Sequence, residues 1–304
     1  MSRRMTMREI STATQFFYFS KEGMIPVAKA ADGETLCIAT KDCYDNLLTD
    51  ESLRHKDLEG REPVANPTSG PVFVEGAHPG DTLKVEILSI ELADHATMRL
   101  TPGHGGLGRA ITSEYVRIFP IKDGKTVDFN GRVLPLSPMI GVIGVAPREG
   151  CIDTDTPGDH GGNMDDRDIT EGTTLYFPVS VEGAMFGLGD VHALMGDGEV
   201  CICGLEAQAK VTVRLSVIHG KQESLPVSEK DGRFAVIASA KTLDESAERA
   251  RYEMLSFLHK RLPDSANDLI LLLSLIGNLS VCQVVDPLQT VRFTLSEKIA
   301  NLQF

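Results

Sequence analysis

Short apolar runs separated by Gly and Pro occupy the first two thirds of the chain. The clearest is 211–217 (VTVRLSV), where apolar residues occupy every second position. Alternation with a period of two places these side chains on one face of a half-buried strand. Other short apolar runs bounded by turn residues predict strands at 72–74, 82–92, 115–121, 139–146, 174–181 and 199–205.

The periodicity changes after about residue 240, where a helical pattern begins. Over 243–262, apolar residues recur every three or four positions and charged residues fill the others, which predicts an amphipathic helix that Pro263 ends. Asp264 or Ser265 can cap a second helix over 266–276. Two further strands are predicted at 280–285 and 291–295.

The 304 residues suffice for one large domain or two ordinary ones. We expect a mainly β fold, with a β-sandwich (jelly-roll-like) body over 1–205 and an α+β portion over 206–304. No Gly/Ser-rich linker separates the two parts, so we expect them to pack together. The apolar stretch 269–285 is interrupted by polar residues and is shorter than the about 20 residues of a membrane span, so we expect a buried element there.

Composition and charge exclude several classes of function. The 43 acidic side chains outnumber the 30 basic ones and give a net charge of −13, which argues against nucleic-acid partners and favours cations. The chain begins without the apolar segment of a signal peptide, and we expect no membrane partner. The six cysteines lack C-x-x-C and zinc-ribbon spacing, which is typical of reduced thiols in a cytoplasmic protein.

An acidic segment at 153–171 is the first candidate for chemistry. It holds seven carboxylates, one arginine, His160 and three glycines. Because the carboxylates repel one another, solvent or a cation must neutralise them, and a solvated loop is the alternative interpretation. An EF-hand is excluded, because Pro157 stands at its fifth position and Met164 at its twelfth.

A second candidate segment covers 187–206. Asp190 and His192 are two residues apart, which places both side chains on one face of an extended chain. Glu199 follows a Gly-rich turn, and Glu206 follows an apolar run. Asp, His and Glu are the ligands that zinc and other divalent ions take in proteins. Asp42, directly after another apolar run, is either a further ligand or a turn residue.

Two loops, at 102–106 and 160–162, share the sequence His-Gly-Gly, in which His104 and His160 come first. They are either simple turns or two walls of one cleft. The chain contains neither the G-x-S-x-G of a serine hydrolase nor a phosphate-binding G-x-x-x-x-G-K-[ST]. Nucleophilic serine and nucleotide-dependent chemistry therefore have no motif in their favour.

Together, these segments resemble the acetamidase/formamidase family over roughly residues 35–295. The likeness rests on HGGNMD at 160–165, GDVH at 189–192 and GDGE at 196–199 followed by Glu206, with weaker matches at 74–81 and 280–287. His78 and Met195 depart from the family pattern, which bears on substrate preference more than on fold. The resemblance implies a β-sandwich-like body with an α+β portion, usually in a homo-oligomer such as a dimer. It also implies hydrolysis of short amides such as formamide or acetamide, with zinc or calcium as the associated metal.

The chemistry of the residues themselves suggests an amidohydrolase that uses metal-activated water. A non-catalytic β-sandwich that binds a metal or a sugar is the alternative, and a cupin-like enzyme is disfavoured because a clustered H-x-H is missing. The hypothesis assigns metal binding to Asp190, His192 and Asp165 with Asp42 or His160, proton transfer to Glu206 or Glu199, oxyanion binding to Asn163 with Gly161 and Gly162, and substrate contact to His104.

Overall fold

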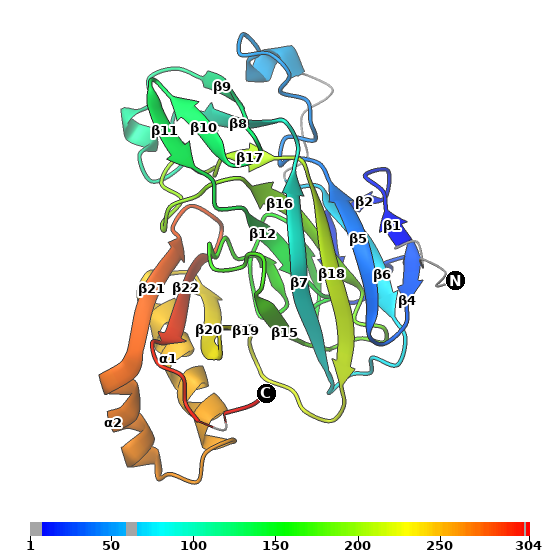
Figure 1. Cartoon of the computed structure of the whole chain (residues 1–304), viewed down its shortest axis with the longest axis vertical. Coiled ribbons are helices and arrows are strands. Elements are labelled where there is room, and N and C mark those ends of the chain that lie inside the picture. The colour runs from blue at the N-terminus through cyan, green and yellow to red at the C-terminus, as the bar shows by residue number, and fades with distance from the viewer. Residues whose placement is uncertain (1–7, 59–65, 301) are drawn as a thin grey trace.

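The computed structural model describes residues 8–58, 66–300 and 302–304 (Figure 1). Within these ranges the chain is mainly β and forms two large sheets, as the sequence predicts. The first sheet runs in the order β1 (Arg8–Ile10), β5 (Glu34–Thr40), β18 (Ala209–Ile218), β7 (Thr82–Leu92), β15 (Thr174–Pro178), β19 (Val227–Lys230), β20 (Arg233–Ala240), β22 (Gln289–Leu295) and β21 (Gly277–Gln283).

The second sheet carries most of the residues that the sequence singles out. Its order is β14 (Gly161–Asn163), β12 (Met139–Gly144), β16 (Phe186–His192), β17 (Glu206–Ala207), β8 (His95–Leu100) and β9 (Tyr115–Pro120), and β6 (Thr68–Val74) joins β16 to β2 (Gln15–Phe16) and β4 (Ala28–Ala30). The shorter elements are the pairs β10 (Thr126–Phe129) with β11 (Arg132–Pro135) and β3 (Tyr18–Ser20) with β13 (Cys151–Asp153), and the 3₁₀ turns η1 (His55–Leu58) and η2 (Gly108–Ala110).

The main core lies between the two sheets. In β18, Val211, Val213 and Leu215 are fully buried while the alternate positions are more exposed, which confirms the predicted alternation. These side chains share one apolar cluster with Ile140 of β12 and Leu188 of β16, in the facing sheet. Burial from both sheets stabilises the sandwich through the hydrophobic effect.

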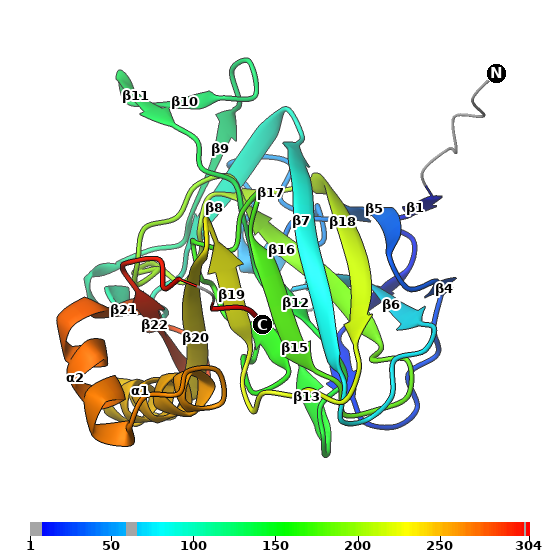
Figure 2. The same ribbon diagram turned by 60° about the horizontal axis from the view of Figure 1, so that its bottom comes forward.

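Two helices cover the end of the first sheet that lies far from β5 and β18 (Figure 2). Helix α1 (Leu243–His259) begins with a capping box between Thr242 and Glu245, and α2 (Ala266–Ile276) has Ser265 as its N-cap. Both helices were predicted, although α1 ends a few residues early. They enclose a second core with β20 and β22.

The expectation that 269–285 is a buried element is wrong for one face of α2. Leu269 and Leu273 are buried, but Leu271 is 64% and Leu275 is 81% exposed. Only one side of α2 packs against neighbouring elements. The apolar residues on its other side therefore remain exposed to solvent, although the sequence is apolar all round.

The predicted strand at 199–205 is also wrong, because this segment is a loop and Glu206 begins the short strand β17 instead. Glu199 and Ile202 adopt positive φ angles of 46° and 72°, and the Ile202 N–H donates to the Glu199 carbonyl. A tight turn of this kind cannot continue as a strand.

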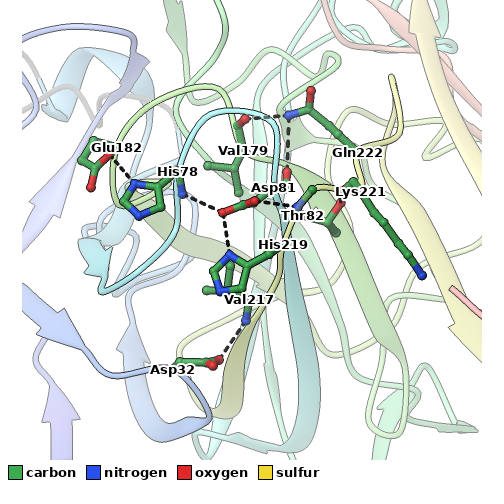
Figure 3. A network of polar contacts seen from close by, with 11 residues as sticks. Asp32, His78, Asp81, Thr82, Val179, Glu182, Val217, His219, Lys221 and Gln222 are labelled. Atoms are coloured by element: carbon green, nitrogen blue, oxygen red, sulfur yellow. Dashed lines mark hydrogen bonds and ion pairs between the residues drawn. The ribbon is translucent and has the colours of Figure 1, made fainter.

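Asp81 ties together three loops at one end of the sandwich (Figure 3). Its buried carboxylate accepts hydrogen bonds from the backbone N–H groups of His78 and Gly220, at 3.0 and 2.8 Å. His219 Nδ1 lies 3.0 Å from the same carboxylate, and His78 in turn pairs with the exposed Glu182. Burial alone would raise the pKa of Asp81, but these hydrogen bonds outweigh it and lower the pKa.

The division into parts near residue 205 stays a prediction. The structure places β18, from the later part of the chain, between β5 and β7 of the earlier part. In the described portion of the chain, neither helix is long and apolar enough to cross a bilayer.

Candidate metal and active site

Four side chains predicted from distant segments converge on the second sheet. His192 ends β16 and lies opposite Glu206 of β17 in the strand register. His192 Nε2 is 3.3 Å from Glu206 Oε2, 3.4 Å from Asp190 Oδ1 and 3.8 Å from Asp165 Oδ1. All four side chains are almost fully buried. The structure thus brings together Asp165, Asp190, His192 and Glu206 as the sequence suggests.

These groups are buried without the hydrogen-bond donors that buried carboxylates require. Among the residues that the structure describes, no hydrogen-bond partner is found for several buried atoms of the cluster. These are both oxygens of Asp165, Oδ1 of Asp190, Oε2 of Glu199, Oε2 of Glu206 and both ring nitrogens of His192. Leaving a buried polar atom unpaired costs about 1–3 kcal/mol, and more for a charged group. A cluster of such unpaired atoms is one that could hold a cationic ligand.

The pKa shifts follow from the same crowding. Burial raises the pKa of Asp165 to about 6 and that of Glu206 to about 8, and in both cases the neighbouring Asp190 carboxylate adds to the rise. Burial also raises the pKa of Glu199 well above its usual range. Burial would lower the pKa of His192, but Glu206 and Asp190 reverse the effect and raise it well above its usual value.

The backbone carrying the carboxylates is unusual. Asp165, Asp190 and Glu199 adopt φ angles of 45°, 51° and 46°, in the left-handed region that residues other than glycine seldom occupy. Gly141 of β12 faces them, and a Cβ at that position would collide with Asp165 Oδ1 and lie 2.7 Å from Asp190 Oδ2. Strained residues that the surrounding structure holds in place are typical of functional sites.

The donor set fits a divalent cation. Ligand atoms of Asp165, Asp190 and His192 all lie within 4.8 Å of one another, and the same holds for His192, Glu199 and Glu206 and for Asp165, Glu199 and Asp286. One imidazole and several carboxylates suit zinc and other divalent ions, and they suit calcium where oxygen ligands dominate.

A cavity of about 220 Å³ opens onto this cluster. Glu206, Glu199, Asn163 and His104, the predicted catalytic and substrate residues outside the glycine pair, all line it. Asn163 Nδ2 donates to Asp286 Oδ2 at 3.1 Å, while its buried Oδ1 has no partner within the described ranges. The remaining walls are formed by Cys43, Tyr44, Asn66, Arg99, Thr101, Asp155, Asp190, Ile202, Val285, Asp286 and Pro287.

Asp42 and His160 lie outside the ligand groups found among the described residues. The Asp42 carboxylate accepts from the backbone N–H groups of Tyr44 and Asn46, at 3.0 and 2.7 Å, which is the role of a turn residue. His160 lines a separate cavity of about 970 Å³ and packs its ring against Phe19. Burial lowers the pKa of His160 to about 4, so its ring is neutral at pH 7.

Gly161 and Gly162 form strand β14 and pair with β12. A Cβ at Gly161 would collide with the Ile143 carbonyl, and the Gly161 N–H donates to the Gly158 carbonyl. Their absent side chains thus allow two strands to approach closely. The close pairing of β14 with β12 thus positions Asn163, the last residue of β14, at the cavity.

Sequence reasoning missed Asp286, Arg99, Tyr44 and Gly141 as site residues. Asp286 lies in the segment 280–287 that resembles the family, so a signal for it existed. Arg99, Tyr44 and Gly141 carry no motif that separates them from other residues of their kind.

Comparison with known sequences and structures shows which proteins this chain is similar to. A sequence model described as the acetamidase/formamidase family matches residues 21–156 and 148–234. The chain belongs to the acetamidase/formamidase family. The crystal structure of an acetamidase from Bacillus halodurans is similar, with 43% identity and a TM-score of 0.90 over 94% of this chain and 96% of that one. The crystal structure of an acetamidase from Yersinia enterocolitica has 28% identity and a TM-score of 0.89, over 96% of this chain and 92% of that one.

A formamidase from Methylophilus methylotrophus is 28% identical over 207 residues, which are 49% of this chain and 51% of the relative. The chain thus matches about half the length of this curated member of the family. The crystal structure of a gamma lactamase from Delftia acidovorans, at 19% identity and a TM-score of 0.63, shares the fold, with 92% of this chain and 88% of that one covered.

Proposed function

We propose that the protein is an amidohydrolase that cleaves a short-chain amide, formamide or acetamide being the simplest, to the carboxylic acid and ammonia. The observation that supports this most is the cluster of unpaired, buried Asp, His and Glu atoms at one wall of a small cavity. Membership of the acetamidase/formamidase family supports the same reaction.

Asp165, Asp190 and His192 would hold a divalent cation, because their ligand atoms lie close together and lack other partners. A bound cation of this kind lowers the pKa of water and polarises a carbonyl group. Zinc is the ion that a site with an imidazole favours, and calcium is the second choice because of the surrounding carboxylates.

Glu206 would take a proton from the attacking water and deliver it to the departing ammonia. Its carboxyl lines the cavity, and burial raises its pKa to about 8, so it can exchange a proton near neutral pH. Glu199 lines the same cavity and is the second candidate for this step. Asn163 would orient the substrate through an amide that already contacts Asp286.

Two measurements test the proposal. Removal of the metal with a chelator should abolish ammonia release from formamide or acetamide, and addition of Zn²⁺ should restore it. Glu206→Gln should lower kcat about 10²- to 10⁴-fold. Glu171→Gln, at an exposed carboxylate outside the cavity, is the matched control and should retain activity. A metal-free protein with full activity would contradict the role of the cation, and a protein that releases ammonia from no amide would indicate a binding protein.

We also infer a cytoplasmic homodimer. All six cysteines are free, which suits a reducing compartment. The exposed apolar residues of α2, Ile270, Leu271 and Leu275, would suit a contact between subunits. Size measurement in solution by light scattering tests the dimer.

A further inference from the structure

Arg99 is a cation in the candidate active-site cavity, and no described carboxylate forms an ion pair with it. It lies on β8 and lines the cavity whose other walls carry Asp155, Asp190 and Glu206. Its Nη1 atom is fully buried and has no hydrogen-bond partner in the described part of the chain. A buried donor without an acceptor is costly, so its presence calls for a ligand that accepts from it.

The guanidinium packs against Tyr44, and its strand β8 is paired with β17, which carries Glu206. Its Cζ lies 5.6 Å from the centre of the Tyr44 ring, an arrangement that orients the planar group. Thr97 of β8 is paired in register with Glu206, and Arg99 is two residues further along the same strand. Residues two apart point to the same face, about 7 Å apart along the strand.

The walls of the cavity therefore differ in chemistry. Asp190, Glu199 and Glu206 line it and belong to the same ligand groups as His192, where a cation and an amide carbonyl would lie. Arg99 lines the same cavity and contributes an Nη1 donor that lacks an acceptor among the described residues. Guanidinium groups pair with carboxylates in a planar, two-bond geometry that neutral groups cannot offer.

We propose that the preferred substrate is the monoamide of a short dicarboxylic acid, and that Arg99 binds its carboxylate. The proposal rests on the amidohydrolase function above and names its substrate class. Formamide and acetamide are smaller than the cavity requires and leave the guanidinium unpaired. The two-residue step along β8 from Thr97, which pairs with Glu206, to Arg99 leads us to choose two or three carbons between amide and carboxylate.

The test compares two amides of the same shape. Succinamate carries a carboxylate, and 4-methylpentanamide has an isopropyl group of similar shape in its place. Ammonia release gives kcat/KM for wild type, Arg99→Gln and the control Arg109→Gln, which removes a cation from an exposed position outside the cavity. Wild type should prefer succinamate by about 10- to 100-fold, the value expected of charge-assisted hydrogen bonds.

Arg99→Gln should lose that preference, because its kcat/KM falls about 10- to 100-fold further on succinamate than on 4-methylpentanamide, and Arg109→Gln should behave as wild type. Equal kcat/KM of wild type for both amides would overturn the proposal and leave the amidohydrolase function standing. An equal loss on both amides in Arg99→Gln would overturn it as well, because Arg99 would then act on the amide itself.

Calorimetric titration with succinate separates failure of the proposal from failure of the proposed function. Succinate should bind wild type at least about 10-fold more tightly than Arg99→Gln. If no amide is cleaved but this difference is found, the carboxylate site stands and the amidohydrolase function does not. If succinate binds both proteins equally, the role of Arg99 is refuted whatever the activity.

Discussion

Arg292 of β22 connects the C-terminal part of the chain to the two loops that carry Asp165 and Glu199. Its guanidinium forms two bonds to Asp197, at 2.9 and 3.0 Å, and its Nε lies 2.8 Å from Asp168 Oδ2. Nη1 lies 3.3 Å from Asp166 Oδ1. Asp166 is the neighbour of Asp165, and Asp197 lies two residues before Glu199. The substitution Arg292→Met removes the charge and keeps much of the side-chain volume.

The three contacts are worth different amounts. The side chains of Asp168 and Asp197 are 53% and 39% exposed, so their pairs contribute about 0.5 kcal/mol each. Asp166 is completely buried, and removal of its partner leaves an uncompensated charge that costs about 3 kcal/mol. The total is about 4 kcal/mol. In a chain of this size each kcal/mol lowers Tm by about 2 °C, so we expect a fall of about 8 °C.

Calorimetry on chelated protein measures this effect without interference from a bound cation. Asp197→Asn, which weakens only the half-exposed contact, is the matched control and should lower Tm by about 2 °C at most. Adding Asp166→Asn to Arg292→Met should recover part of the loss, because it removes the stranded charge. An Arg292→Met protein that melts within about 2 °C of wild type, or a double variant no more stable than the single one, would refute the reasoning.

Three further predictions concern other parts of the structure. The pKa of His160 is about 4 in the folded protein and about 6.5 in the unfolded chain, so the unfolded chain binds more protons between these pH values. Protonation of the unfolded chain therefore lowers the free energy of unfolding of wild type by about 2 kcal/mol at pH 5 and does not change it at pH 8. His160→Phe should therefore compare better with wild type at pH 5 than at pH 8 in thermal melts, and an equal difference at both pH values would contradict this. Gly141→Ala should weaken Zn²⁺ binding at least about 10-fold in a chelator competition, because the added methyl group displaces Asp165 and Asp190. The control Gly196→Ala should bind Zn²⁺ as wild type does, because a Cβ at that position meets no described atom within 4 Å. Asp81→Asn should lower the free energy of unfolding in urea by about 2 kcal/mol, because it weakens the hydrogen bonds to the buried carboxylate. Glu182→Gln, which changes an exposed pair, should lower it by less than about 0.5 kcal/mol. Similar losses in the two variants would show that burial of Asp81 adds nothing to stability.

Local patterns were sufficient to predict the elements of regular structure. The alternation at 211–217 and the helical spacing after residue 240 are short-range signals, and the structure follows both. The strand predicted at 199–205 fails because an apolar run alone cannot distinguish a strand from a buried loop. The segment bends because Glu199 and Ile202 adopt positive φ angles, which neither glutamate nor isoleucine predicts in a sequence.

The sequence by itself determined the chemistry available to the site: Asp165, Asp190, His192, Glu199 and Glu206 stand in segments where polar residues interrupt apolar runs or where carboxylates cluster. Only the tertiary structure decided which of them meet, that Asp286 joins them, and that Asp42 and His160 do not. It also placed Arg99 in the same cavity. The physical reason is that pairing between strands distant in sequence sets these distances, and a lone arginine or glycine in a strand gives no local sign of its partners across the sheet.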